Sequence, residues 1–134
     1  MLKEETPTAC FEILKAEPQA LLIDCRSAIE WELLGTADLS SLGKKTLMVE
    51  WTTQSNQRNP DFLDQVAQFA TKQTPIIIMC RIGGRSASAG HYLLEHGFTN
   101  VTNMLGGYEG KVDQNGHRNS IEGWRADQLP WQQS

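Results

Sequence analysis

Residues 75–86 read PIIIMCRIGGRS, and this stretch decides the fold. The run Pro75–Met79 is short, β-branched and uninterrupted, which is typical of a strand buried on both faces of a parallel sheet. A helical pattern follows, for which Ser86 is the expected cap and Gly97 the expected stop. The sequence therefore predicts Cys80 at the carboxyl end of a buried strand, facing the N-terminus of a helix.

The glycine-rich turn behind Cys80 is suited to hold an anion. Gly83 and Gly84 permit the positive φ angles at which successive N–H groups of a loop point inward. The positive end of the helix dipole favours the thiolate, so we expect Cys80 to be an ionised nucleophile at neutral pH. Arg81 and Arg85 add positive charge that would attract an anionic substrate. A tight strand-to-helix turn with a buried thiol before it would give the same pattern without activity.

Strand and helix patterns alternate along the rest of the chain. Three further segments are expected to be helical: Pro7 to the residue before Pro18, Ala28–Leu34 with Gly35 closing it, and about Pro60–Lys72. Three further segments are expected to be strands: Ala20–Asp24, Thr46–Trp51 and Asn100–Met104. This alternation predicts an α/β fold in which ligands bind beyond the carboxyl ends of the strands.

Composition narrows the classes of function. A chain of 134 residues has the usual size of one domain, so we expect a single domain over residues 1–134. No apolar run approaches the roughly 18 residues that cross a bilayer, so no membrane contact is expected. No basic tract accompanies the net charge of −4, so no nucleic-acid partner is expected. The first residues do not read as a secretory signal, and the three cysteines form no CxxC pair, which favours a cytoplasmic protein without a disulfide framework or structural zinc.

Four stretches of the chain resemble the single-domain rhodaneses, sulfurtransferases that carry sulfane sulfur as a cysteine persulfide. LLIDCRS at 21–27 resembles the family's Asp-x-Arg strand end, and IIIMCRIGGRS at 76–86 resembles its active-site loop. GFTNVTNMLGGYEG at 97–110 resembles the following strand and glycine turn, and Gly123-Trp124 with Leu129-Pro130-Trp131 resembles the C-terminal segment. The resemblance implies a rhodanese-like three-layer fold, in which a central, mostly parallel sheet has helices on both faces.

The resemblance also implies roles for individual residues. Cys80 is expected to form the persulfide, with Arg85 as the second catalytic residue. The other loop residues are expected to bind substrate: Arg81, Ile82, Gly83, Gly84 and Ser86. Asp24 and Arg26 are expected to shape the site from the neighbouring strand, more as a structural salt bridge than as catalytic groups. No metal or organic cofactor is implied. The implied partners are a small anionic sulfur donor such as thiosulfate and an acceptor that is a thiol, cyanide or a protein cysteine.

Several readings stay open at this point. Rhodanese-fold phosphatases and arsenate reductases place five residues between the cysteine and the arginine, whereas four lie between Cys80 and Arg85, so the shorter loop favours sulfur transfer. A sulfur-relay or sensory module that acts on a partner protein would use the same loop.

Two segments depart from the family pattern. WELLGTADL at 31–39 lacks the family's Gly-His-Ile-Pro-Gly-Ala turn, and KVDQNGHRNSIEG at 111–123 is longer than the family's usual link to the final helix. These departures leave the identity of the substrate open. Trp51 and Cys25 could contribute to the site or belong to the core.

Overall fold

The central feature of the computed structural model, which describes residues 1–53 and 55–133, is a sheet of five parallel strands. The order across the sheet is β1-β6-β5-β2-β4. Its strands are β1 (Lys3–Glu5), β2 (Leu21–Asp24), β4 (Leu47–Met48), β5 (Ile76–Met79) and β6 (Val101–Met104). A separate antiparallel pair is formed by β3 (Thr36–Ala37) and β7 (Trp131–Gln132).

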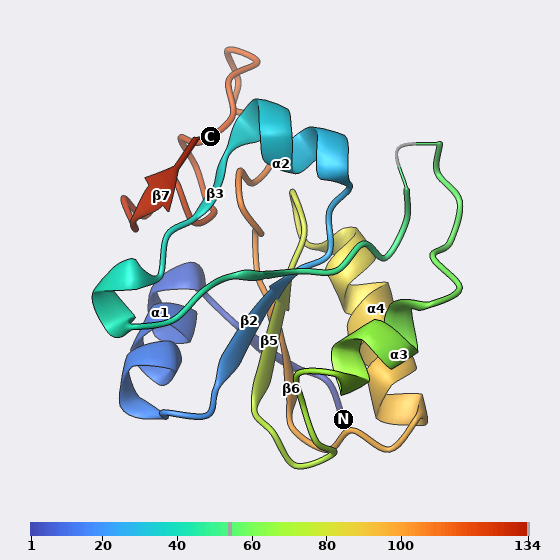
Figure 1. The fold of residues 1–134 in the computed structure, drawn as a ribbon. Helices are drawn as coiled ribbons and strands as arrows, with labels where there is room; N and C mark the ends of the chain where they lie inside the picture. Colours follow the sequence, from blue (N-terminus) through green and yellow to red (C-terminus); the bar gives the residue numbers. More distant parts are fainter. Residues whose placement is uncertain (54, 134) are drawn as a thin grey trace.

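Helices cover both faces of the sheet (Figure 1). The helices are α1 (Pro7–Ala16), α2 (Ala28–Leu34), α3 (Phe62–Ala67) and α4 (Gly84–Glu95), with a short 3₁₀ turn at Ser40–Leu42. Helix α2 lies beyond the carboxyl ends of the strands (Figure 1). One face packs against α3 and α4, and the other packs against α1 and the C-terminal segment that contains Trp124. The α/β fold expected from the alternating patterns, a parallel sheet between two helical layers, is confirmed. No helix in the described part of the chain is long and apolar enough to cross a membrane.

The middle strand β5 explains how the site is positioned. All of its residues are buried, as expected for a strand covered on both faces. Ile78 lies in register with Ile23 of β2 on one side and Asn103 of β6 on the other. Because these strands are parallel, their carboxyl ends meet at the same edge of the sheet, where Cys80 directly follows β5.

The start of α4 differs from the expectation. Ser86 is not the N-cap of this helix, because the helix begins at Gly84 and the N-cap is Gly83, with φ at +112°. Ser86 lies in the first turn, and its main-chain N–H points at the Cys80 sulfur. The end of the helix agrees with the expected stop, since Glu95 is its last residue and Gly97 adopts a φ of +95°.

Two expected elements are shorter in the structure, and three short strands were not expected. Helix α3 does not extend over Pro60–Lys72, since it begins at Phe62 and ends at Ala67. After it, a turn in which Thr71 and Thr74 bond to each other leads the chain into β5. Strand β4 does not extend over Thr46–Trp51, although the N–H groups of Val49 and Trp51 still donate to Asp24 and Cys25. The short strands β1, β3 and β7 carry no alternating apolar pattern that would reveal them.

Candidate active site at the carboxyl end of the sheet

The Cys80 sulfur lies inside the loop that follows β5, and the loop donates hydrogen bonds to it. The N–H of Gly83 is 3.1 Å from Sγ and that of Ser86 is 3.3 Å from it. The Ser86 hydroxyl lies 3.3 Å from the same sulfur. The positive φ of Gly83 turns its N–H inward, a conformation that glycine adopts without strain. Inward N–H groups at a helix N-terminus stabilise a negative charge on Sγ or on an atom attached to it.

Asn103 of β6 holds the far side of this loop. Its amide oxygen accepts the Ser86 hydroxyl at 2.6 Å, and its amide nitrogen donates to the Gly83 carbonyl at 3.2 Å. The side chain is buried, so these bonds compete with no bulk water. Asn103 was not singled out from the sequence. The sequence signal for Asn103 is a polar residue inside a short strand, and the structure shows that every residue of this strand is buried.

The glycine turn after β6 supports the loop from behind. Tyr108 N–H donates to the Cys80 carbonyl at 2.8 Å, and the N–H groups of Glu109 and Gly110 donate to the Arg81 carbonyl at 2.9 and 3.1 Å. Gly107 adopts a φ of +63°, and a Cβ atom there would lie 2.5 Å from the Cys80 carbonyl oxygen. The close approach of the two loops therefore requires glycine at position 107.

Arg85 leaves the loop to pair with Glu30 on α2. The two guanidinium nitrogens lie 2.6 and 2.9 Å from the two carboxylate oxygens, which is a bidentate ion pair. Glu30 also accepts the N–H and hydroxyl of Ser27 at the start of its own helix. Burial raises the pKa of Glu30, but the bonds from Arg85 and Ser27 outweigh burial and bring this pKa to about 2. The sequence signal that would have indicated Glu30 is the Ser-x-x-Glu capping box of Ser27 and Glu30.

Arg81, the other arginine of the loop, also has a carboxylate partner. Its Nε donates to Oε1 of Glu109, whose side chain is almost fully buried. Glu109 is brought there by the same turn that supports the loop, because its main-chain N–H donates to the Arg81 carbonyl. Both expected cations of the site are thus engaged by acids that were not singled out from the sequence.

Asp24 and Arg26 form a buried ion pair on the opposite face of the sheet from Cys80. Both side chains are fully buried, and the guanidinium donates to both carboxylate oxygens at 2.7–3.1 Å. Arg26 also donates to the carbonyl of Gly35 at 2.7 Å and stacks on the Tyr108 ring. These contacts connect the end of α2 and the glycine turn to the sheet, while Cys80 belongs to the apolar cluster of the other face.

Cys25 lies beside Cys80 at the end of the neighbouring strand. Its N–H donates to the Met79 carbonyl, and its side chain belongs to the same apolar cluster as that of Cys80. Burial, with smaller contributions from Cys80 and Asp24, raises the pKa of the Cys25 thiol far above its ordinary value. Cys25 therefore stays protonated at neutral pH and is a poor nucleophile.

Trp51 belongs to the core and not to a substrate pocket. Its ring is buried and packs edge-on against Phe62 at a centroid distance of 5.1 Å, with Tyr92 at 5.4 Å. The Arg58 guanidinium covers this ring, 3.5 Å from its centroid. Trp51, the last residue of the strand expected over Thr46–Trp51, thus fixes α3 and α4 to the sheet.

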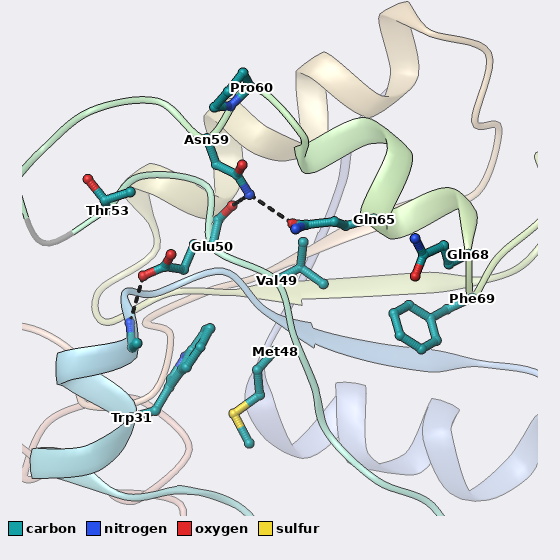
Figure 2. Close-up of a pocket in the computed structure, with 11 residues that line it drawn as sticks. Trp31, Met48, Val49, Glu50, Thr53, Asn59, Pro60, Gln65, Gln68 and Phe69 are labelled. Carbon is teal, nitrogen blue, oxygen red and sulfur yellow. Dashed lines mark hydrogen bonds between the residues drawn. The ribbon is translucent and has the colours of Figure 1, made fainter.

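A surface pocket of about 420 Å³ lies beyond β4, between α2 and α3 (Figure 2). Figure 2 shows the Glu50 carboxylate directed at the first turn of α2, where it accepts the Ala28 N–H at 2.8 Å. The Asn59 amide donates to the Glu50 carbonyl and to Gln65 of α3. None of the described residues that line this pocket belongs to the Cys80 loop. The Glu50 carboxylate at this pocket fixes the start of α2, the helix that carries Glu30.

The remaining loop residues mark the outer side of the site. Ile82 is half-exposed and Gly84 is exposed, whereas Cys80 is only 1% exposed. A reactant must therefore approach past the loop tip. Among the described residues, no group of three His, Cys, Asp or Glu side chains is placed to hold a metal ion.

Acid is expected to weaken the fold through Glu30. A pKa of about 2 in the folded protein lies below the value of about 4.3 expected for an unfolded chain, so the ion pair contributes fully above about pH 5. The contribution is lost as the pH falls toward 2. In Glu30→Gln the amide can still cap the helix but does not titrate. The stability advantage of the wild type over this variant, measured by urea unfolding, should shrink by about 3 kcal/mol between pH 6 and pH 2. An advantage that does not change with pH would contradict the pairing.

Comparison with known proteins agrees with this geometry. The chain is similar to a crystal structure of Rv0390 from Mycobacterium tuberculosis, with a TM-score of 0.92 and 40% identity over 98% of each chain. A protein of Rickettsia rickettsii, the RP600 homolog, is 31% identical over 127 residues, which is 93% of each chain. The chloroplastic thiosulfate sulfurtransferase 16 of Arabidopsis thaliana is 47% identical over 51 residues, covering 38% of this chain and 42% of the plant protein.

A family model also matches most of the chain. The model described as the rhodanese-like domain matches residues 8–114, which include β2, the Cys80 loop and the glycine turn behind it. The loop around the Cys80 sulfur lies at the carboxyl end of β5, within the matched residues. The chain therefore belongs to the rhodanese-like domain family.

Proposed function

We propose that the protein is a sulfurtransferase that carries one sulfane sulfur as a persulfide on Cys80. The observation that carries this proposal is the placement of the Cys80 sulfur between the N–H groups of Gly83 and Ser86. Membership of the rhodanese-like family and the similarity to a thiosulfate sulfurtransferase support the same class of reaction. In this proposal no metal or organic cofactor takes part.

The reaction proceeds in two steps of nucleophilic covalent catalysis. In the first step the Cys80 thiolate attacks the outer sulfur of thiosulfate or a similar sulfane donor. The bond to the donor breaks and its electron pair leaves with the donor, as sulfite in the case of thiosulfate. In the second step a thiol, cyanide or a protein cysteine attacks the outer sulfur of the persulfide, and the electron pair returns to Cys80 as the thiolate.

The loop stabilises the negative charge that moves between the two sulfur atoms. The N–H groups of the loop and the N-terminus of α4 supply partial positive charge. The Ser86 hydroxyl donates to Asn103 and so holds the first turn of α4 in place. Gly84 leaves open space at the loop tip, and Ile82 contacts the incoming reactant there.

The charged residues take positioning roles. Arg85, through Glu30, fixes the loop to α2, and Arg81, through Glu109, fixes it to the glycine turn. The Asp24–Arg26 pair shapes the site from the other face of the sheet, because Arg26 binds the carbonyl of Gly35 at the end of α2.

A relay module that passes sulfur to one partner protein is the second candidate. The exposed Ile82 at the loop tip favours it, because an apolar side chain beside a buried nucleophile suits contact with a protein acceptor. Sulfur transfer that becomes fast only with a protein cysteine as acceptor would identify the protein as such a relay module.

Turnover assays test the proposed function. The wild type, supplied with a sulfane donor and cyanide, is expected to form thiocyanate, and Cys80→Ser is expected to form none above background. Cys10→Ser is the matched control, because Cys10 is buried in the other apolar cluster and its pKa is raised to about 12 by burial and, to a smaller degree, by Glu5. Thiocyanate formation by Cys80→Ser at the wild-type rate would overturn the proposal.

A further inference from the structure

The arginine side chains of the loop are already neutralised. Arg85 makes its bidentate pair with Glu30, and Arg81 pairs with Glu109. Both carboxylates come from outside the loop, one from α2 and one from the glycine turn after β6. Neither guanidinium therefore offers an uncompensated positive charge to a ligand of the Cys80 loop.

The two carboxylates are held in place by further bonds. Glu30 accepts both the N–H and the hydroxyl of Ser27, and its side chain is only 18% exposed. The Glu109 side chain is 6% exposed, and its main chain is bonded to Arg81 and to Asn119. An anion that sought the terminal nitrogens of Arg85 would have to displace a fixed, largely buried carboxylate, which would then lose its charged partner. Arg81 is engaged only through Nε, so an anion at its partly exposed guanidinium would instead meet the negative charge of Glu109 beside it.

The electrostatics of the loop follow from these pairs. The charges of the two arginines and the two glutamates cancel, as do those of the buried Asp24–Arg26 pair. A thiolate on Cys80 leaves this group of side chains with net negative charge. A dianion such as thiosulfate meets repulsion there, whereas a persulfide carries at most one negative charge on its reacting sulfur.

We propose that Glu30 and Glu109 are specificity-determining residues, and that they make a persulfide the preferred sulfur donor over dianionic thiosulfate. The inference rests on the proposed function of Cys80 and narrows its donor. The Cys80 thiolate attacks the terminal sulfur of R–S–SH, and a new S–S bond forms. The S–S bond of the donor breaks, and its electron pair leaves with R–S⁻. The proton stays on the transferred sulfur, so no oxidant or reductant is needed.

The test compares two donors on four proteins. The donors are thiosulfate and the persulfide of N-acetylcysteine methyl ester, whose only ionisable group is the S–SH group. The proteins are the wild type, Glu109→Gln, Glu30→Gln and the control Glu95→Gln. Glu95 is the last residue of α4. This helix has twelve residues, so Glu95 lies roughly 18 Å from the end of the helix that faces the loop. Glu95→Gln therefore changes the net charge alone. The second-order rate constant for loading Cys80 is measured for each combination by intact-protein mass spectrometry.

The wild type is expected to react at least about tenfold faster with the persulfide than with thiosulfate. Glu109→Gln and Glu30→Gln should each raise the thiosulfate rate constant by about tenfold, because each variant frees one arginine charge. The same variants should change the persulfide rate constant by less than about threefold, and Glu95→Gln should change neither constant.

Two results would overturn the inference, and they are distinguishable. Equal wild-type rates with both donors, or thiosulfate rates that neither glutamine variant raises, would remove the specificity role and leave Cys80 as the sulfur carrier. Failure of both donors to load Cys80 in the wild type would overturn the proposed function and the inference together. Thermal unfolding of each variant identifies a protein that fails to fold, and the other glutamine variant then supplies the result.

Discussion

We expect Arg26→Met to lose about 3–5 kcal/mol of the free energy of unfolding, because it leaves the Asp24 carboxylate buried without its charged partner. The guanidinium makes three of the bonds that Asp24 accepts and one to the Gly35 carbonyl at the end of α2. A loss of this size is a large fraction of the stability of an ordinary domain. Urea unfolding followed by circular dichroism measures it.

An exposed ion pair provides the control. Lys15 and Glu12 lie 3.4 Å apart on the surface of α1 with more than half of each side chain exposed, so Lys15→Met should cost less than about 0.5 kcal/mol. The double variant Asp24→Asn with Arg26→Met removes both buried charges and should recover part of the loss. An Arg26→Met protein as stable as Lys15→Met would show that the buried pair contributes little.

Gly107→Ala should damage both the fold and the sulfur site. A Cβ at this position would lie 2.5 Å from the Cys80 carbonyl oxygen and 2.8 Å from the Arg81 carbonyl, which are main-chain atoms with little freedom to move. The positive φ of +63° adds the strain of a left-handed conformation. We expect a loss of about 3 kcal/mol in the free energy of unfolding, and slower loading of Cys80 with sulfur because its peptide is displaced.

Gly43→Ala separates the two causes. Gly43 has a similar φ of +70°, and a Cβ there has nothing within 4 Å, so this variant carries the backbone strain alone, about 1 kcal/mol. Its rate of sulfur loading should equal that of the wild type. If Gly107→Ala and Gly43→Ala lost the same stability and both kept the wild-type loading rate, the close approach of the two loops would have no energetic importance.

The parts of the fold that the sequence predicts are those with a local cause. The run Ile76–Met79 is apolar because β5 is buried on both faces, and the Thr6-Pro7 pair starts α1, where the Thr6 hydroxyl accepts the Ala9 N–H. Strand β1 has no such signal. Its residues Lys3–Glu5 are exposed, and only the edge of β6 makes them a strand.

The sequence predicts the main-chain conformation of the loop around Cys80, but it does not predict the ion pairs of Arg81 and Arg85. The glycines and the strand-to-helix junction are encoded within residues 80–86, so the loop around Cys80 could be anticipated. The partners of Arg85 and Arg81 are 55 and 28 residues away in sequence, and only the folded sheet brings them together. Ser86 illustrates the remaining difference, because a hydroxyl that suits a helix cap serves instead as a partner of the Cys80 sulfur and of Asn103.

The most direct test of the Cys80 carrier is the intact mass of the protein after exposure to a sulfane donor and removal of excess reagent. We expect the wild type to gain the mass of one sulfur atom and to lose it again when cyanide is added, while Cys80→Ser gains nothing. A wild-type protein that gains no sulfur from thiosulfate or from a small-molecule persulfide, or a Cys80→Ser variant that gains it equally, would contradict the account.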